Sequence, residues 1–497
     1  MPLLPAARSI LAFALVSASL GLGLESRVRA QTIPSTTPAA GSASAVSTAK
    51  TLLEQPASIY RERRAELMER IAAAEKLDPS NKDATAPEVL VVLVGELDEP
   101  EDARFRQNNW FAYLTGVDSP RASLVLRVPQ REETLYLPAR NKMMERWTGP
   151  KLGPGPEGVE ATGCARVEPA SRFNADLKKF VGGGKVDEAK KDEPATASAI
   201  VYVISPYVRD DASGPTARLT KTIRDLAPSA KIKGLSGILG EMRKRKSAPE
   251  IALLRRAIDI TGDAQAAVMR GLAPGVKEYE LEGALMGAFI SGGAQRAGFP
   301  SIVGSGPNST VLHHNSNRRT AEAGELVVVD IGAEYFYYTA DITRTFPISG
   351  TFTPRQREIY QLVLDAQRHA ESVFEVGETT PAELHQEVVD FLRKSPLRAK
   401  NAAGVEQTMD RFFIHGLGHY LGMDVHDVGN AGKPYMPGEV FTIEPGIYIT
   451  TENLGVRIED DYLVTEKGLE KLSKAIPVEI DAIEKAIAEA RSGGRAE

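Results

Sequence analysis

The sequence contains only one cysteine, and this scarcity excludes several kinds of site. Cys164 has no partner for an intrachain disulfide, and a single thiol cannot form a CxxC zinc site or a redox pair. Its neighbours, Gly163 and Ala165, provide no general base. We therefore interpret Cys164 as a structural thiol rather than as a nucleophile.

A basic excess and two common hydrolase motifs are also missing. The formal net charge is −6, and Lys and Arg are scattered along the chain, so we expect no nucleic-acid partner. No HExxH string occurs, which sets the zincin class aside. The segments Gly304-Ser305-Gly306 and Leu235-Ser236-Gly237 lack GxSxG spacing, so a serine hydrolase is not expected either.

Long hydrophobic runs are confined to the N-terminus. Arg8 precedes the apolar run Ile10 to Leu24, and Val28-Arg29-Ala30 has the small-x-small pattern of a signal-peptidase site. Residues 1–30 are therefore predicted to be a signal peptide. The alternative is an uncleaved anchor, although this run is shorter than the ~20 residues that span a bilayer. We expect an exported protein, periplasmic or secreted, with no membrane association after cleavage.

Two folded domains are expected in the rest of the chain, because 497 residues exceed one ordinary core. Residues 31–57, rich in Ser, Thr, Ala and Pro, are predicted to form a flexible spacer. Residues 58–244 alternate helical patterns with apolar runs such as Val89 to Val94, which predicts an α/β domain. The segments Gly149 to Gly163 and Gly182 to Pro194 are predicted to be surface loops.

A second domain is predicted over residues 245–475. Its start is marked by Ser247-Ala248-Pro249-Glu250, which has the pattern of a capping box at the beginning of a long helix. A second helix follows over Tyr279 to Ile290, and strand-like segments come after it. Residues 476–497 are predicted to be a helical tail, with the segment Ile480 to Arg491 forming a solvated terminal helix.

Acidic residues interrupt several strand-like segments of this second domain. They are Asp330, Asp341, Glu444 and Glu459, and we expect a hairpin to bring Asp330 and Asp341 face to face. An unpaired carboxylate in a buried strand is costly, and clustered carboxylates repel one another. Two divalent cations would neutralise four such groups, so the sequence predicts a dinuclear metal site.

Histidines cluster in the same part of the chain. All seven lie after residue 312, and we interpret His369 and His385 as surface or packing residues because they fall on helical stretches. The segment from His415 to His419 offers one nitrogen ligand. Carboxylates with a single imidazole favour Mn²⁺, with Co²⁺ or Zn²⁺ as alternatives.

The motifs around these residues resemble the pita-bread metallopeptidases, and among them the aminopeptidase P group. The matching strings are Val329-Asp330-Ile331-Gly332, Asp341 to Phe346, His415 to His419, Val425-His426-Asp427, Ile443 to Gly446 and Arg457 to Asp461. Arg106 to Gly116 also resembles the creatinase/prolidase-type N-terminal domain of that family, so the likeness extends over Tyr60 to Leu472. It implies an α/β N-terminal domain followed by an α+β pita-bread catalytic domain.

The resemblance also implies a role for each site residue. Asp330 would bind one metal ion, Asp341 and Glu459 would bridge both, and His419 with Glu444 would hold the other. A water bridging the two ions would be the nucleophile, with Glu444 as proton shuttle. His313 and His426 would hydrogen-bond the substrate, and His415 would line a proline pocket.

Two further residues lie beside these motifs. Arg457 is two positions from Glu459, on the same face of a strand, and is expected to orient that bridging carboxylate and help bind substrate. His314 stands where the family pattern has Tyr, and its role is left open.

The implied activity is release of the N-terminal residue from peptides with proline in second position. The family resemblance also suggests a homodimer or homotetramer. The nearest alternative is a prolidase, which cleaves Xaa-Pro dipeptides with the same ligands, but the segments around Glu444 are short for a prolidase. Methionine aminopeptidase and creatinase fit less well, because the former lacks the large N-terminal domain and the latter lacks the metal ligands. An inactive binding module of the same fold is the alternative from another class.

Overall fold

The computed structural model describes residues 51–77, 88–97, 104–181, 199–205 and 214–493. Residues 1–50 are not among them, so the predicted signal peptide and most of the predicted spacer lie outside the described residues, as does the predicted loop Gly182 to Pro194. Within the described part of the chain, no helix is both long and apolar enough to cross a membrane.

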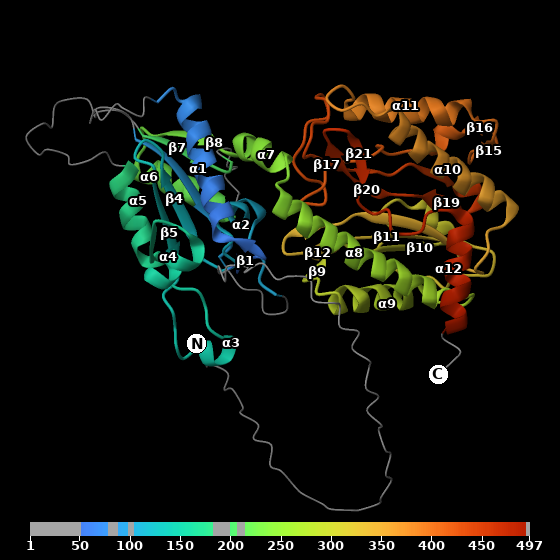
Figure 1. Cartoon of the computed structure of the whole chain (residues 1–497), viewed down its shortest axis with the longest axis horizontal. Helices are drawn as coiled ribbons and strands as arrows, with labels where there is room; N and C mark the ends of the chain where they lie inside the picture. The colour runs from blue at the N-terminus through green and yellow to red at the C-terminus, as the bar shows by residue number, and fades with distance from the viewer. Residues whose placement is uncertain (1–50, 78–87, 98–103, 182–198, 206–213, 494–497) are drawn as a thin grey trace, which may run out of the picture. The chain divides into compact units, whose positions relative to one another are not determined.

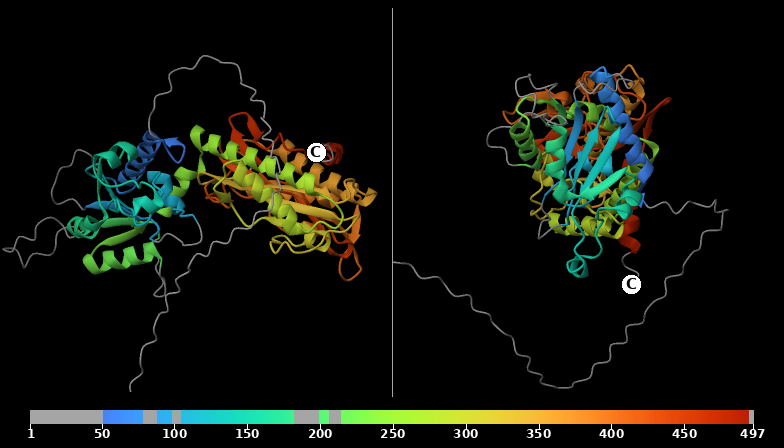
Figure 2. Two further views of the ribbon diagram at one scale, coloured as in Figure 1. Left: turned by 90° about the horizontal axis from the view of Figure 1, so that it is seen from below. Right: turned by 90° about the vertical axis from the view of Figure 1, so that its left-hand side faces the viewer.

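The N-terminal half is built on one mixed six-stranded sheet in the order β6-β5-β4-β3-β7-β8. Its strands are β3 (Val89–Val94), β4 (Ser123–Arg127), β5 (Glu132–Leu137), β6 (Arg166–Pro169), β7 (Ile200–Val203) and β8 (Lys231–Gly234). Strand β3 pairs antiparallel with β4 and parallel with β7. The right-hand view of Figure 2 shows these strands side by side.

Helices cover both faces of this sheet, which explains why β3 is apolar along its whole length. Val91 and Leu93 pack with residues of α1 (Ala57–Ala74), while Leu90 and Val92 pack with α5 (Phe173–Val181) and α6 (Pro215–Leu226). The short helices of this half are α2 (Asn109–Thr115), α3 (Glu145–Thr148), α4 (Pro156–Thr162) and α7 (Ser236–Lys244). The predicted α/β architecture is present.

Helix α4 corrects one prediction, because it lies within the segment Gly149 to Gly163 that was expected to be a loop. Pro156 occupies the first turn of the helix, and Gly163 ends it with a φ of 66°. Proline at the start and glycine just past the end are capping residues, not interruptions of the helix. Gly and Pro were therefore misread as loop signals.

The half that is predicted to be catalytic, called the catalytic half below, begins at the predicted capping box. The Glu250 carboxylate accepts a hydrogen bond from the Ser247 backbone N–H at 2.8 Å, and α8 (Ala248–Gly271) follows. Helix α8 packs against α9 (Glu278–Ser291), and α10 (Pro354–Val373) packs against α11 (Pro381–Lys394). In Figure 1 the strands of this half lie between these two helix pairs.

Those strands form several small antiparallel sheets. They are β9 (Arg296–Ala297), β10 (Ile302–Ser305), β11 (Leu326–Ile331), β12 (Ala333–Tyr335), β13 (Tyr338–Thr339), β14 (Ile342–Pro347), β15 (Arg398–Lys400), β16 (Glu406–Thr408), β17 (Val440–Ile443), β18 (Gly446–Ile449), β19 (Leu454–Arg457), β20 (Asp460–Thr465) and β21 (Gly468–Lys471). Strand β11 is central in its sheet, between β10 and β14, and β20 is central between β17 and β21. The small sheets share one continuous apolar core with the helices.

The C-terminal helix α12 (Ile480–Gly493) corrects a second prediction. It was expected to be a solvated terminal helix, yet Ile483 and Ile487 are fully buried in the core of the catalytic half. Arg491 also donates hydrogen bonds to the backbone carbonyls of Leu272, Ile348 and Ser349. Isoleucines every three or four residues form a narrow buried stripe that the Ala- and Glu-rich composition had obscured.

Candidate metal centre and active site

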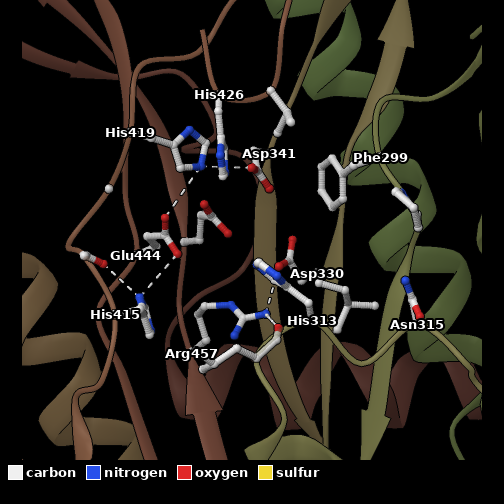
Figure 3. Close-up of a pocket in the computed structure, with 17 residues that line it drawn as sticks. Phe299, His313, Asn315, Asp330, Asp341, His415, His419, His426, Glu444 and Arg457 are labelled. Atoms are coloured by element: carbon white, nitrogen blue, oxygen red, sulfur yellow. Dashed lines mark hydrogen bonds and ion pairs between the residues drawn. The ribbon is translucent and has the colours of Figure 1, made fainter. Parts of the chain in front are cut away.

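All nine residues assigned to the site from the sequence line one pocket of about 530 Å³. They are His313, Asp330, Asp341, His415, His419, His426, Glu444, Arg457 and Glu459 (Figure 3). Phe299, Pro300, Ile302, Leu312 and Val425 add an apolar wall to the same pocket. Residues that are up to 146 positions apart in sequence, from His313 to Glu459, are thus brought together by the fold.

Strand pairing places the acidic residues at or just beyond strand ends. Asp330 lies on β11 opposite Thr343 of β14, and Asp341 precedes β14 by one residue. Because Asp341 and Thr343 share a face of that strand, the two aspartates are diagonal neighbours and not directly opposite each other. Glu444 follows the last residue of β17, and Glu459 lies between β19 and β20.

The loop that carries His419 is held against β17 by backbone hydrogen bonds. Thr442 N–H donates to the His419 carbonyl at 2.9 Å, and Glu444 N–H donates to the Leu417 carbonyl at 2.8 Å. A Cβ on Gly418 would lie 1.9 Å from the Thr442 carbonyl oxygen, so only glycine permits this approach. The close contact places the imidazole of His419 beside the carboxylates.

The His419 ring is oriented for binding a cation. Its Nδ1 lies 3.1 Å from the Tyr420 carbonyl, which can only accept a hydrogen bond, so the Nδ1 carries the proton. The other ring nitrogen, Nε2, lies 3.3 Å from Asp341 Oδ2 and 3.6 Å from Glu444 Oε1, on the side of the carboxylates. Ligand atoms of Asp341, His419 and Glu459 all lie within 4.8 Å of one another.

The electrostatics of the cluster fit a bound cation. Burial, followed by the nearby Asp330, Asp461 and Glu444 carboxylates, raises the pKa of Asp341 well above its usual range. Burial and the Asp341 carboxylate do the same for the pKa of Glu459. Burial also raises the pKa of Glu444 to about 7, although His419 and Arg457 oppose the shift.

Two buried carboxylate oxygens without hydrogen-bond partners in the described part of the chain also support a bound cation. Asp330 Oδ1 and Asp341 Oδ1 have no hydrogen-bond partner among the described residues. Carboxylate oxygens without a partner beside the imidazole of His419 are a donor set that suits divalent cations such as Mn²⁺, Co²⁺ or Zn²⁺. The residues present therefore fit the predicted metal pair.

Arg457 has a different carboxylate partner from the one expected. Its Nη2 donates to Asp330 Oδ2 at 2.8 Å, whereas it reaches Glu459 only through Thr343, whose hydroxyl accepts from Arg457 Nε at 3.2 Å and donates to Glu459 Oε2 at 2.7 Å. Strand β19 ends at Arg457, so the two-residue alternation does not continue to Glu459. The side chain orients Asp330 directly.

Tyr448 on β18 was missed from the sequence. Its hydroxyl accepts a hydrogen bond from Arg457 Nη1 and contacts His415 Nε2, each at 2.8 Å. Burial and the Arg457 charge lower the pKa of His415 to about 4, so this imidazole is neutral at pH 7. Apart from its place on an apolar strand next to Glu444, no sequence signal marks Tyr448.

The two remaining histidines of the site lie on opposite segments at the exposed mouth of the pocket. His426 lies beside His419, with ring centroids 4.1 Å apart, and His313 follows the short helix η2 (Gly306–Thr310). Partial burial, with His419 and His313 nearby, lowers the pKa of His426. His314, whose role was left open, lies 3.1 Å from the buried Glu278 and not in the pocket.

Comparison with known proteins places the chain in a family. Residues 252–466 match the model of metallopeptidase family M24, and residues 60–187 match that of the aminopeptidase P N-terminal domain. The Xaa-Pro aminopeptidase of Escherichia coli K12 is 35% identical over 440 residues, which cover 83% of this chain and 96% of that protein. The chain belongs to metallopeptidase family M24.

Solved structures of M24 proteins agree with this assignment. A variant of Escherichia coli aminopeptidase P in complex with substrate has a TM-score of 0.73 and 30% identity, and covers 88% of this chain and 99% of that one. A putative aminopeptidase P from Bacillus anthracis has a TM-score of 0.74 and 29% identity, with 87% and 99% covered. The family and the fold class predicted from the motifs are thereby confirmed, as is the prediction of a metallopeptidase that acts on peptides.

Proposed function

We propose that this chain is an Xaa-Pro aminopeptidase, which releases the N-terminal residue from peptides with proline in second position. The observation that carries the proposal is the convergence of four carboxylates and one correctly oriented imidazole in a pocket with an apolar wall. The relatives named above, which are Xaa-Pro aminopeptidases and aminopeptidase P, support the same specificity.

Five residues would hold the metal pair: Asp330, Asp341, His419, Glu444 and Glu459. Two divalent ions at this position supply an activated water and polarise the scissile carbonyl. Mn²⁺ is the preferred ion, with Co²⁺ and Zn²⁺ as alternatives, because the donor set is mostly carboxylate oxygen.

The protein's own side chains handle substrate and protons. The Glu444 carboxylate lies between His415 and His419, with Oε2 3.7 Å from His415 Nδ1 and Oε1 3.6 Å from His419 Nε2. There it can take a proton from the attacking water and pass it to the leaving proline nitrogen. His313 and His426, at the mouth, can hydrogen-bond the peptide backbone. Arg457 holds Asp330 in place through an ion pair to its Oδ2.

The proline specificity is proposed to come from shape. An Xaa-Pro peptide bond has no N–H to donate, so a site recognises it through a surface that fits the ring and not through an added acceptor. Neutral His415, fixed between the Gly416 carbonyl and Tyr448 at 2.8 Å each, supplies a rigid flat wall. We assign the proline ring to this side of the pocket.

The test is hydrolysis of an Xaa-Pro-Yaa tripeptide and of the matching Xaa-Pro dipeptide, with Mn²⁺ restored after chelation. The tripeptide should be cleaved only with metal, and preference for the dipeptide would instead indicate a prolidase. Asp341→Ala should lose bound metal and nearly all turnover, while Asp259→Ala, an exposed aspartate of α8, should not. A metal-free wild type with full activity would contradict the proposal. A metal-loaded wild type with no peptidase activity would instead favour the inactive binding module of the same fold.

Export and assembly are further parts of the proposal. The predicted signal peptide over residues 1–30 supports a periplasmic or secreted enzyme, which N-terminal sequencing of the mature chain would test by locating the cleavage site. A homodimer or homotetramer is supported by large apolar side chains exposed in and beside α3, where Trp147 is 83% and Met143 is 68% exposed. Light scattering should show a dimer or tetramer, and a monomer would refute this part.

A further inference from the structure

The N-terminal segment that carried the family resemblance contacts a loop of the active site. Asn109, at the start of α2, is buried, and its Nδ2 donates to Asp424 Oδ1 at 2.6 Å and to the Met423 carbonyl at 2.9 Å. Residues 423–427, here called the His426 loop, also carry Val425, and both Val425 and His426 line the pocket. The N-terminal half of the chain therefore bonds to the loop that presents His426.

A buried cationic pair holds the same loop from a second side. Arg243, at the end of α7, is 1% exposed and donates through Nη2 to Asp424 Oδ2 at 2.7 Å and to Asp427 Oδ1 at 2.5 Å. Lys246 Nζ lies 3.1 Å from Asp427 Oδ2, and both of these side chains are 1% exposed. The two aspartates that enclose Val425 and His426 are thus both bound by residues that precede the catalytic half.

The guanidinium of Arg243 is itself fixed by the N-terminal segment. It lies over the ring of Trp110, with 4.5 Å between the guanidinium carbon and the ring centroid. A stacked guanidinium is restricted in rotation, so its hydrogen-bonding edge keeps one direction. Neighbouring residues 109 and 110 therefore act on the loop twice, once directly and once through Arg243.

His426 depends on this loop for its orientation. Among the described residues its ring makes no hydrogen bond, and its nearest ring neighbour is His419. In Figure 3 the two rings lie close together at one end of the pocket. The loop backbone is tightly set, because a Cβ on Gly422 would lie 2.1 Å from Asp427 Oδ2. A shift of Asp424 or Asp427 would therefore move the His426 ring.

We propose that Asn109 and Arg243 are positioning residues for catalysis, through which the N-terminal domain sets the place of His426 at the metal centre. The inference rests on the proposed function for the role of His426, but not for the contacts themselves. It assigns Asn109 and Trp110, within the segment Arg106 to Gly116, a task in the same chain. Loss of a single positioning contact should lower turnover more than substrate binding.

The test uses a pair of exchanges across the Asn109–Asp424 contact, because truncating buried Arg243 would leave charges unpaired and endanger folding. Asn109→Asp replaces the amide donor by a carboxylate facing Asp424, and the repulsion should lower kcat about tenfold with KM changed less than twofold. Adding Asp424→Asn restores a donor facing residue 109, while the remaining oxygen of the amide can still accept from Arg243 Nη2. Asp424 is half-exposed and tolerates the change. The double variant should recover to within about threefold of wild type.

Arg106→Ala is the matched control. It breaks a different contact between the two halves, the ion pair of Arg106 with Glu334 at 2.9 Å, and leaves the His426 loop untouched. Its kcat should stay within about twofold of wild type. An equal loss in Arg106→Ala, or no recovery in the double variant, would mean that general domain packing is being measured, and the inference would be wrong.

A spectroscopic arm separates this inference from the proposed activity. The chain has seven histidines, so their imidazole signals can be resolved by NMR on the full-length metal-free protein, with His426→Gln assigning one of them. Asn109→Asp should move the His426 signal and leave that of His369, on α10, unchanged. An unmoved His426 signal overturns the inference even if the wild type is active. A moved signal in a protein without Xaa-Pro activity would uphold it while the proposed function fails.

Discussion

Glu444→Gln should stabilise the metal-free protein while it abolishes the activity. Burial raises the pKa of Glu444 to about 7, from the usual 4.5 of a glutamate. An acid whose pKa is higher in the folded state destabilises that state as the pH rises, since ionisation is easier in the unfolded chain. The cost is small below pH 4.5 and is complete above pH 7.

The size of this cost follows from the shift of about 2.5 pKa units, each worth about 1.4 kcal/mol. It is about 3 kcal/mol at pH 8 and falls to about 1 kcal/mol at pH 5. Because the side chain is 17% exposed, these are upper values. Gln has nearly the same shape without the charge, so Tm at pH 8 should rise by roughly 3 °C if both halves of the chain unfold together and by roughly 6 °C if the catalytic half unfolds alone.

The assay is scanning calorimetry of wild type and Glu444→Gln in chelator, at pH 8 and at pH 5. Metal should reverse the order at pH 8, because the wild type gains the free energy of metal binding and the variant lacks one ligand. Asp259→Asn, at an exposed position of α8, serves as the control for charge removal. Equal Tm values for wild type and variant in chelator at pH 8 would refute the argument that the buried charge of Glu444 destabilises the metal-free protein.

Three further predictions concern structure outside the metal ligands. Glu278→Gln should lower stability by about 1–3 kcal/mol at pH 7, because Glu278 accepts bonds from Ser305 N–H, Asn308 and Arg319 N–H. Burial of Glu278 raises its pKa, but those bonds outweigh burial and the pKa is lowered. Urea unfolding should therefore show the difference between the two proteins shrinking as the pH falls through that pKa, and a constant difference would contradict this. Deleting residues 480–497 should cost roughly 5–9 kcal/mol, from the burial of Ile480, Ile483 and Ile487, and leave little soluble protein, whereas deleting 494–497 should change the yield little. Burial raises the pKa of the Cys164 thiol to about 11, so native protein should resist a thiol reagent at pH 8 and Cys164→Ala should keep full kcat; rapid labelling of the folded chain would show that the thiol is accessible.

Local signals in the sequence located many elements of the fold. Strand β3 was predicted to the residue, because its apolar run ends at Gly95, and the start of α8 was fixed by its capping box. Both depend on interactions within a few residues of the chain. Helix α4 was predicted to be a loop because its capping residues, Pro and Gly, are also typical of loops. Helix α12 was predicted to be solvated because its burial depends on helices distant in sequence.

The site shows the same division between local and distant causes. Carboxylates in apolar strands are visible in the sequence, because a buried charge requires a compensating partner. The sequence did not predict that Arg457 hydrogen-bonds Asp330 and not Glu459. This pairing depends on where β19 ends and on how β11 lies beside it. The hydroxyl of Tyr448 between Arg457 and His415 likewise follows only from tertiary packing.

The hairpin between the two aspartates bears on how the chain could be improved. Phe336 and Tyr337 occupy its turn with φ angles of 44° and 75°, a conformation that costs about 1 kcal/mol or more for such residues. The Tyr337 hydroxyl offsets part of this by donating to Asp118 at 2.5 Å and accepting from Gln107 N–H at 2.8 Å. Phe336, by contrast, is partly exposed. An engineer seeking heat tolerance would therefore begin with glycine or asparagine at position 336 and leave its neighbour alone.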